Sequence, residues 1–111
     1  MTEWVSGNIF LRPMRFARAG DVIKGHAHNF DHTTFVTRGA VRIERLTDMG
    51  EVQDSVDKAA EDTFNWVLIR AGVIHRITAL RDDSLANCVY AHRDPQGEVV
   101  AVHEGWTPAY E

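Results

Sequence analysis

Short runs rich in apolar, β-branched and aromatic residues recur along this chain, and turn residues separate them, which predicts strands. Between residues 41 and 46, Val41 and Ile43 alternate with Arg42 and Glu44, the two-residue period of a strand with one buried face. The runs of this kind cover residues 8–14, 33–37, 41–46, 51–57, 64–69, 75–80, 84–91 and 98–103. The turn signals between them include Arg38-Gly39, Thr47-Asp48-Met49-Gly50, Ala71-Gly72, Asp82-Asp83 and Asp94-Pro95-Gln96-Gly97.

Helical character is confined to residues 58–62, and five residues do not hold a helix alone. Regularly spaced short strands without helices favour a sandwich or barrel over a βαβ architecture. We therefore predict an all-β fold, with residues 1–111 forming a single domain.

Composition narrows the classes of partner. A hydrophobic fraction of 44% and a charged fraction of 25% are ordinary for a folded globular chain. The net charge is -4 and no continuous basic stripe is present, so nucleic acid is not an expected partner. No apolar run approaches the roughly 18 residues of a membrane helix, and the first residues do not resemble a signal peptide, so no membrane association is expected. The single cysteine, Cys88, fits a reducing cytoplasm and is interpreted as a small buried hydrophobe.

Histidines and glycines recur at fixed spacings in two segments, Gly20-x5-His26-x-His28-x3-His32-x6-Gly39 and Gly72-x2-His75. Neutral imidazole is the commonest metal ligand among side chains. Two histidines at i and i+2 on one strand share a face, about 6.6 Å apart along the backbone. The pattern therefore predicts a metal site in the interior of a β-structure.

These residues resemble the motifs of the cupins, small β-barrels of jelly-roll type. The first cupin motif, Gly-x5-His-x-His-x3-Glu-x6-Gly, is matched at every spacing, with His32 in place of the glutamate. The second, Gly-x5-Pro-x-Gly-x2-His-x3-Asn, falls on Phe64, Arg70, Gly72, His75 and Ala79, so only Gly72 and His75 are kept. The resemblance implies a cupin-type jelly-roll β-barrel, also described as a double-stranded β-helix.

The resemblance also implies one divalent transition metal ion, held by His26, His28, His32 and His75. Imidazole ligands suit Fe, Zn, Ni and Cu alike, so the metal is not identified. With histidine at position 32 the site carries one more positive charge than the family pattern, which makes the ion a stronger Lewis acid. Three questions stay open. The site is either a closed structural one or an open catalytic one, and His32 either binds the ion or swings out to leave three histidines. Asp31 is either an acceptor for an imidazole N–H or a solvated loop carboxylate.

Strand alternation nominates further residues of the pocket. If His75 faces inward, so do Ile77 and Ala79. On the next strand the inward set is either Ala86, Cys88, Tyr90 and His92 or Leu85, Asn87, Val89 and Ala91. The former set brings Tyr90 and His92 to the barrel mouth as candidate catalytic proton donor and base. Phe30, Phe35, Phe64 and Trp66 are interpreted as core aromatics, and Arg38, Arg42 and Arg70 as solvated, with a carboxylate clamp as the alternative for one of the arginines.

The leading hypothesis is a metal-dependent cupin enzyme that acts on a small organic molecule by an oxygenase-like, dioxygenase-type reaction. This reaction is favoured because histidine-only sites in related proteins often hold iron and activate oxygen. The alternatives are a non-catalytic binding, sensor or storage module with a structural metal or bound ligand, and a scaffold that has lost its metal. A homodimer is expected from the resemblance, because it would cover the aromatic residues near the termini, Trp4, Trp106 and Tyr110.

Overall fold

The computed structural model describes residues 4–6, 8–28, 30–91, 93 and 95–98, and places nine strands in them and no helix. The strands are β1 (Trp4–Ser6), β2 (Ile9–Phe16), β3 (Val22–His26), β4 (His32–Arg38), β5 (Ala40–Leu46), β6 (Val52–Ala59), β7 (Trp66–Ile69), β8 (Ile74–Ala79) and β9 (Ser84–Ala91). The predicted all-β class is therefore confirmed. Among the residues that the structure describes, no helix offers the length and apolar character needed to cross a bilayer.

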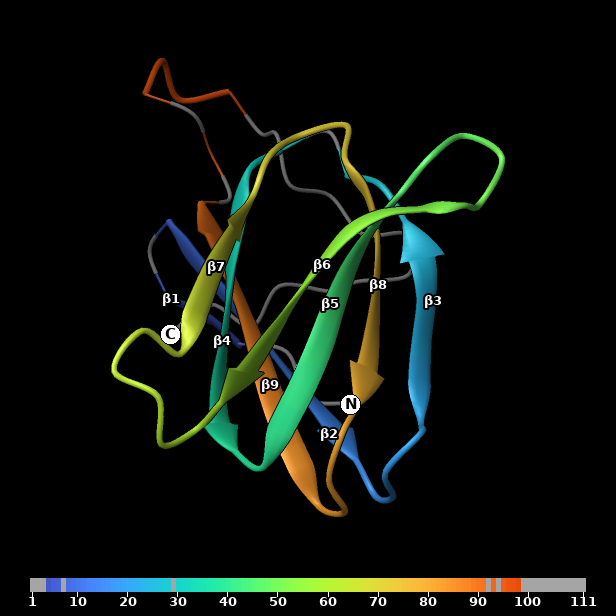
Figure 1. Cartoon of the computed structure of the whole chain (residues 1–111). Coiled ribbons are helices and arrows are strands. Elements are labelled where there is room, and N and C mark those ends of the chain that lie inside the picture. The colour runs from blue at the N-terminus through green and yellow to red at the C-terminus, as the bar shows by residue number, and fades with distance from the viewer. Residues whose placement is uncertain (1–3, 7, 29, 92, 94, 99–111) are drawn as a thin grey trace.

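The strands form two antiparallel sheets that lie face to face (Figure 1). One sheet has five strands in the order β1-β2-β9-β4-β7, and the other has four in the order β3-β8-β5-β6. Neighbours in both sheets are mostly distant in sequence, so the connections pass repeatedly from one layer to the other, as in a jelly roll. β7 and β6 each form one edge of their respective sheets, and most of their side chains are exposed or half-buried.

The observed strand limits show where alternation predicted well and where it did not. The run at residues 84–91 coincides with β9, and residues 41–46 lie within β5. The helix-like residues 58–62 begin inside a strand instead, because Ala40 of β5 pairs with Ala59 and extends β6 to that residue. Strand β1 was not predicted, and β3 was expected only as the strand that carries His26. They are short, and pairing with β2 and β8 holds them in place. Residues 99–103 of the last predicted strand lie outside the described residues.

The core lies between the sheets and is built from alternate strand positions. On β8, His75, Ile77 and Ala79 are all buried, as predicted. On β9 the inward set is the one that contains Ala86, Cys88 and Tyr90, since β9 pairs with both β2 and β4 and must direct this face toward the opposite sheet. The largest aromatic contributions come from Phe10, Phe16, Phe30 and Tyr90. Phe64 and Trp66, predicted as core residues, are exposed instead, because they belong to the edge strand β7 and the turn before it.

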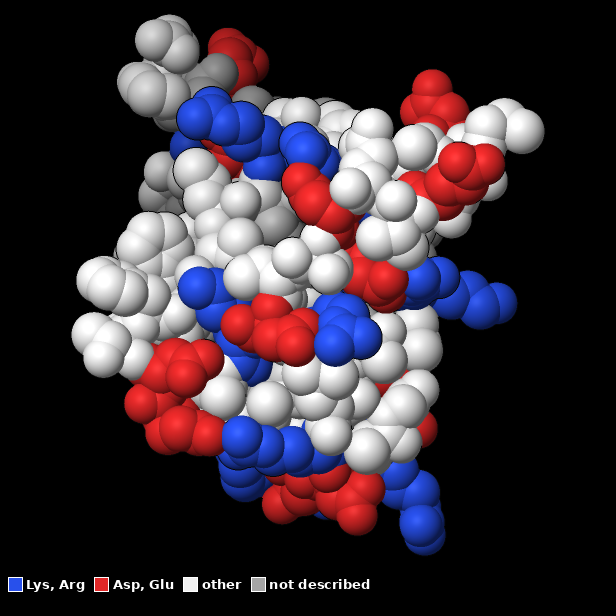
Figure 2. Space-filling model, in the orientation of Figure 1, with Lys and Arg blue, Asp and Glu red and all other residues white. Residues whose placement is uncertain are grey.

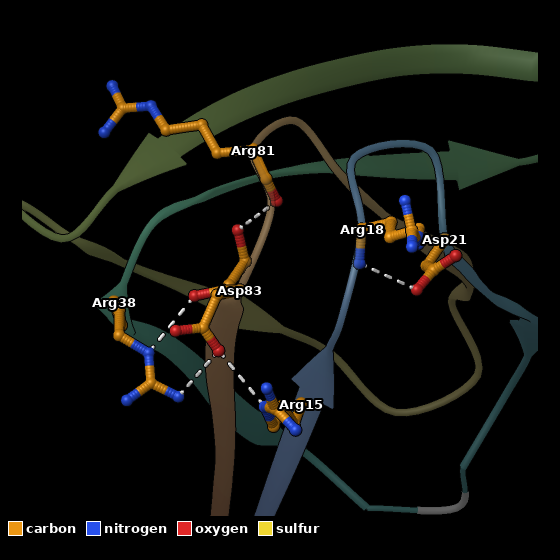
Figure 3. Close-up of polar contacts among 7 residues, drawn as sticks. Arg15, Arg18, Asp21, Arg38, Arg81 and Asp83 are labelled. Atoms are coloured by element: carbon orange, nitrogen blue, oxygen red, sulfur yellow. Dashed lines mark hydrogen bonds and ion pairs between the residues drawn. The ribbon is translucent and has the colours of Figure 1, made fainter.

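Arginine–aspartate contacts close the end of the barrel at which β4 ends and β9 begins (Figure 3). Asp83 adopts a positive φ of 53° in the turn before β9. Its carboxylate accepts from Arg15 Nε at 3.1 Å and from Arg38 at 3.2 Å, while its carbonyl accepts from Arg38 Nε at 3.1 Å. Arg38, predicted to be solvated, therefore fastens β4 to this turn while staying half exposed.

The outer face of the four-stranded sheet carries charges of both signs in matched pairs. Figure 2 shows basic and acidic residues interspersed over the face formed by β5 and β6. On this face Arg42 pairs with Asp57 at 2.8 Å and Arg76 with Glu44 at 2.9 Å. Arg45 lies opposite the buried His75 and pairs with Asp54 at 2.5 Å at the rim of the inner face instead. Cross-strand pairs of opposite charge stabilise the register of a sheet. A surface that binds the phosphate backbone of a nucleic acid is positively charged instead, and this mixed face does not have that character.

Candidate metal centre

Three histidines from three segments meet at the end of the barrel opposite the arginine–aspartate contacts. One ring nitrogen from each of His28, His32 and His75 lies within 4.8 Å of the others. The ring centroids are 5.2 Å apart for His28 and His32, 5.0 Å for His32 and His75, and 5.9 Å for His28 and His75. His32 and His75 are almost fully buried, at 3% and 2% exposure, and His28 is half-buried. Three imidazoles at this spacing can share one ion.

The fold brings these histidines together from different sheets. His32 begins β4 in the five-stranded sheet, and His75 is the second residue of β8 in the four-stranded sheet. His28 lies in the connection between β3 and β4, which crosses from one sheet to the other. In Figure 1 this is the upper end, where β3 ends and where β4 and β8 begin. The cluster therefore bridges the two layers of the barrel.

The turn at residues 70–73 is fastened to the histidine-bearing connection by two hydrogen bonds. Gly72 N donates to the carbonyl oxygen of His28 at 2.8 Å, and Ala71 N donates to Asp31 Oδ1 at 2.7 Å. Gly72 has a φ of 83°, a conformation that glycine adopts without steric cost. From the sequence, Asp31 was either an acceptor for an imidazole N–H or a solvated loop carboxylate. Its carboxylate is exposed, and it also accepts a hydrogen bond from the backbone of the turn, which neither interpretation included.

The orientation of His75 follows from one backbone contact. Its Nδ1 lies 3.1 Å from the carbonyl oxygen of Val73. A carbonyl oxygen only accepts hydrogen bonds, so the neutral ring carries its proton on Nδ1 and keeps the lone pair on Nε2. Metal-bound histidines characteristically donate their second ring N–H to such an acceptor, which fixes the ring and the tautomer. Sequence reasoning missed this role of Val73 because it is performed by the backbone, which every residue carries.

Aromatic rings surround the cluster on the side of β9. Phe30 stacks on His28 with centroids 4.7 Å apart and an interplanar angle of 21°. Tyr90 packs between Phe30 and Phe10, at 4.4 and 4.6 Å, and its ring centroid is 6.4 Å from that of His32. Phe30 thus combines its predicted place in the core with a direct contact to a candidate ligand.

Two predicted site residues are not placed by the structure. His26 ends β3 and its backbone pairs with His75, but its side chain lies outside the part that the structure describes. His92 lies outside the described residues altogether. The expectation that His26 and His28 share one strand face is wrong, because β3 ends at His26 and His28 lies beyond the strand.

A cavity of about 410 Å³ reaches the cluster at His75. It lies between β5 and β6 of one sheet and β7 of the other, and the turn that carries Val73 closes one side. This volume falls in the range of small-molecule sites. The cavity was not predicted, because it depends on the gap between two edge strands that only the topology makes neighbours.

The three-histidine donor set fits a transition metal. Neutral imidazole is a ligand of Zn, Cu, Fe and Ni, whereas Mg and Ca require oxygen ligands. With three protein ligands, a tetrahedral ion keeps one position for water or substrate. The partial burial of His28, beside two buried rings, leaves one side from which a small molecule can approach.

No family model matches the sequence, and no curated protein matches it. Solved structures do match. KdgF from Halomonas sp. superposes with a TM-score of 0.66 at 20% identity, over 86% of this chain and 79% of that one. A cupin superfamily protein from Desulfitobacterium hafniense DCB-2 gives 0.57 at 16% identity, over 73% and 65%.

The S161A mutant of the Bacillus subtilis oxalate decarboxylase OxdC gives a TM-score of 0.61 at 20% identity. The match covers 76% of this chain but only 21% of the larger protein. By its architecture, this chain is a small protein of the cupin fold.

Proposed function

We propose that this protein is a metal-binding cupin that acts on a small organic molecule in an oxygenase-type reaction. The observation that carries the proposal is the convergence of His28, His32 and His75 within 4.8 Å beside a cavity of about 410 Å³. A structural ion needs no such cavity, whereas a catalytic ion needs both an open position and space for a substrate.

In this proposal the three described histidines hold the ion, and His26 is the candidate fourth ligand. When bound, a redox-active iron or copper ion supplies one-electron chemistry with dioxygen. Val73 keeps the Nε2 lone pair of His75 directed away from the backbone carbonyl. Phe30 packs against the ring of His28 and limits the approach of water from that side.

Tyr90 and His92 remain our candidates for the groups that move protons. The support for Tyr90 is its buried position on the inward face of β9, with its ring 6.4 Å from that of His32. A phenol beside a metal site can donate a hydrogen bond to a bound substrate or return a proton to a product. Replacing Tyr90 by phenylalanine keeps the ring contacts and removes only the hydroxyl.

Elemental analysis of anaerobically purified protein tests the proposal. We expect about one iron or copper per chain, and loss of that metal in His28→Ala, His32→Ala and His75→Ala. Arg42→Gln, a change in an exposed ion pair outside the cluster, is the control and is expected to retain the metal. Zinc as the only metal would contradict the oxygenase assignment, and metal-free protein that is insensitive to the histidine changes would contradict the whole proposal.

We further propose that the protein is a homodimer in the cytoplasm. Support for self-association comes from large apolar side chains exposed on and beside β7, with Phe64 at 67%, Trp66 at 49% and Leu68 at 47% exposure. The terminal aromatics named from the sequence lie outside the part of the chain whose side chains are described. Sedimentation showing a monomer at micromolar concentration would contradict the dimer. Localisation is tested by fractionating cells of the source organism.

A further inference from the structure

The cavity beside the cluster has aliphatic walls. Its lining combines inward positions of β5, β6 and β7 with the turn before β8, namely Ile43, Val56, Val67, Ile69 and Val73. Among the lining residues that the structure describes, Ser55 supplies the one hydroxyl group. Such walls stabilise the hydrocarbon part of a ligand by excluding water, and they offer few partners to a molecule covered with hydroxyl groups.

Most of the charged groups at the rim of the cavity are occupied by one another. Arg45 donates to both carboxylate oxygens of Asp54, at 3.2 and 2.5 Å. Glu44 accepts from Arg76 Nε at 2.9 Å, and its side chain is only 13% exposed. These groups hold β5 to β6 and β8, and their charges are already compensated.

Arg70 differs from these residues. It follows the last residue of β7, lines the same cavity as His75, and is exposed. Within the part of the chain that the structure describes, no ion pair involves Arg70. Its neighbour Ala71 is bound by Asp31, so the backbone that carries Arg70 is fastened to the histidine-bearing connection. A positive charge therefore stands at the rim on an anchored turn, and no acidic side chain among the described residues forms an ion pair with it.

We infer that this cavity takes a small organic monoanion, with its carboxylate on Arg70 and its hydrocarbon body against the aliphatic walls. Guanidinium presents parallel N–H groups that match a carboxylate in a bidentate geometry. A molecule bound in this way extends from Arg70 toward His75 and so toward the metal position. The inference rests on the proposed metal-binding function of the three histidines, and it makes Arg70 the residue that selects substrate charge.

Isothermal titration of the metal-loaded protein with matched probes tests the inference. Butyrate and benzoate are compared with butyramide and benzamide, which have similar shapes and no charge. We expect each anion to bind roughly tenfold more tightly than its amide, and gluconate, a polyhydroxylated anion, to bind more weakly than butyrate. Equal affinity for butyrate and butyramide, or tighter binding of gluconate, would overturn the inference.

Variants identify the group that recognises the charge. Arg70→Gln is expected to remove most of the preference for butyrate over butyramide, and Arg70→Lys to restore part of it. Arg18→Gln is the matched control, because Arg18 is an exposed arginine in the loop between β2 and β3, at the other end of the barrel (Figure 3). A preference that persists fully in Arg70→Gln would show that the metal alone attracts the anion, and this would refute the role of Arg70.

Metal content, measured on the same samples, separates this inference from the proposed function. If the protein binds metal stoichiometrically but Arg70→Gln binds butyrate as the parent does, the inference fails and the proposed function stands. If the protein binds no metal, the proposed function fails whatever the anion titrations show. The melting temperature of Arg70→Gln checks its folding, and we expect it to be unchanged because the side chain is exposed.

Discussion

Substitution of Gly39 by alanine should destabilise this fold far more than the same change at Gly20, the other glycine of the first histidine motif. Gly39 lies between β4 and β5 with a φ of 71°. A Cβ placed there would contact Ser84 Oγ and lie 2.9 Å from both Cα and Cβ of Ser84. Ser84 cannot easily move, because it is fully buried and its Oγ accepts from Ala40 N at 3.1 Å.

Two costs add at Gly39. The left-handed backbone costs a residue with a Cβ about 1–2 kcal/mol, and overpacking of a close contact costs about 1–3 kcal/mol. The expected loss is therefore about 2–5 kcal/mol in the free energy of unfolding. For a chain near 100 residues this corresponds to a fall of roughly 10–20 °C in the melting temperature. At Gly20, with a φ of 91° and no atom within 4 Å of the added Cβ, only the first cost applies.

Thermal unfolding followed by circular dichroism measures both variants under the same conditions. The double variant Gly39→Ala with Ser84→Gly removes the contacts to Oγ and Cβ but also the Ser84 hydrogen bonds, so it should recover only part of the loss. Equal falls in melting temperature for Gly39→Ala and Gly20→Ala would refute the close-approach argument. The first motif would then need its glycines for backbone conformation alone.

Three further outcomes are expected. Asp31→Ala should weaken metal affinity by roughly tenfold, measured by chelator competition, because the bond to Ala71 N positions the turn that precedes His75; unchanged affinity would count against this role. The hydrogen bond from Arg76 lowers the pKa of Glu44 in the folded protein. The ionised carboxylate therefore stabilises the fold fully above its unfolded-state pKa, about 4.3. This stabilisation is lost as the pH falls through the lower folded-state pKa. Glu44→Gln should therefore reduce stability at neutral pH and flatten its acid dependence in denaturant titrations, and parallel curves would contradict this. Burial raises the pKa of the Cys88 thiol, so iodoacetamide should modify it only after unfolding, and rapid labelling of native protein would contradict the structure.

The alternation of apolar and polar residues predicted many of the strands, because it depends only on residues that are close in sequence. The inward set of β8, with His75, Ile77 and Ala79, follows from a period of two once one member is assigned. The same rule left two choices for β9, and it could not find β1 and β3. β1 has only three residues, too few to show a period, and hydrogen bonds from β2 and β8 hold β1 and β3 in place.

The sequence by itself determined an all-β chain with metal-ligating residue types at fixed spacings, since side-chain chemistry and alternation are properties of neighbouring residues. The resemblance to the cupin motifs predicted a shared site for His28, His32 and His75, and the structure brings these three rings together. Only the tertiary structure decided that Asp31 binds the turn at Ala71 and that a cavity opens beside the cluster. These features depend on contacts between residues some 40 positions apart, and on the strand order that makes β6 and β7 the edges of two facing sheets. Local patterns carry no information about such distances, which the packing of the two sheets sets.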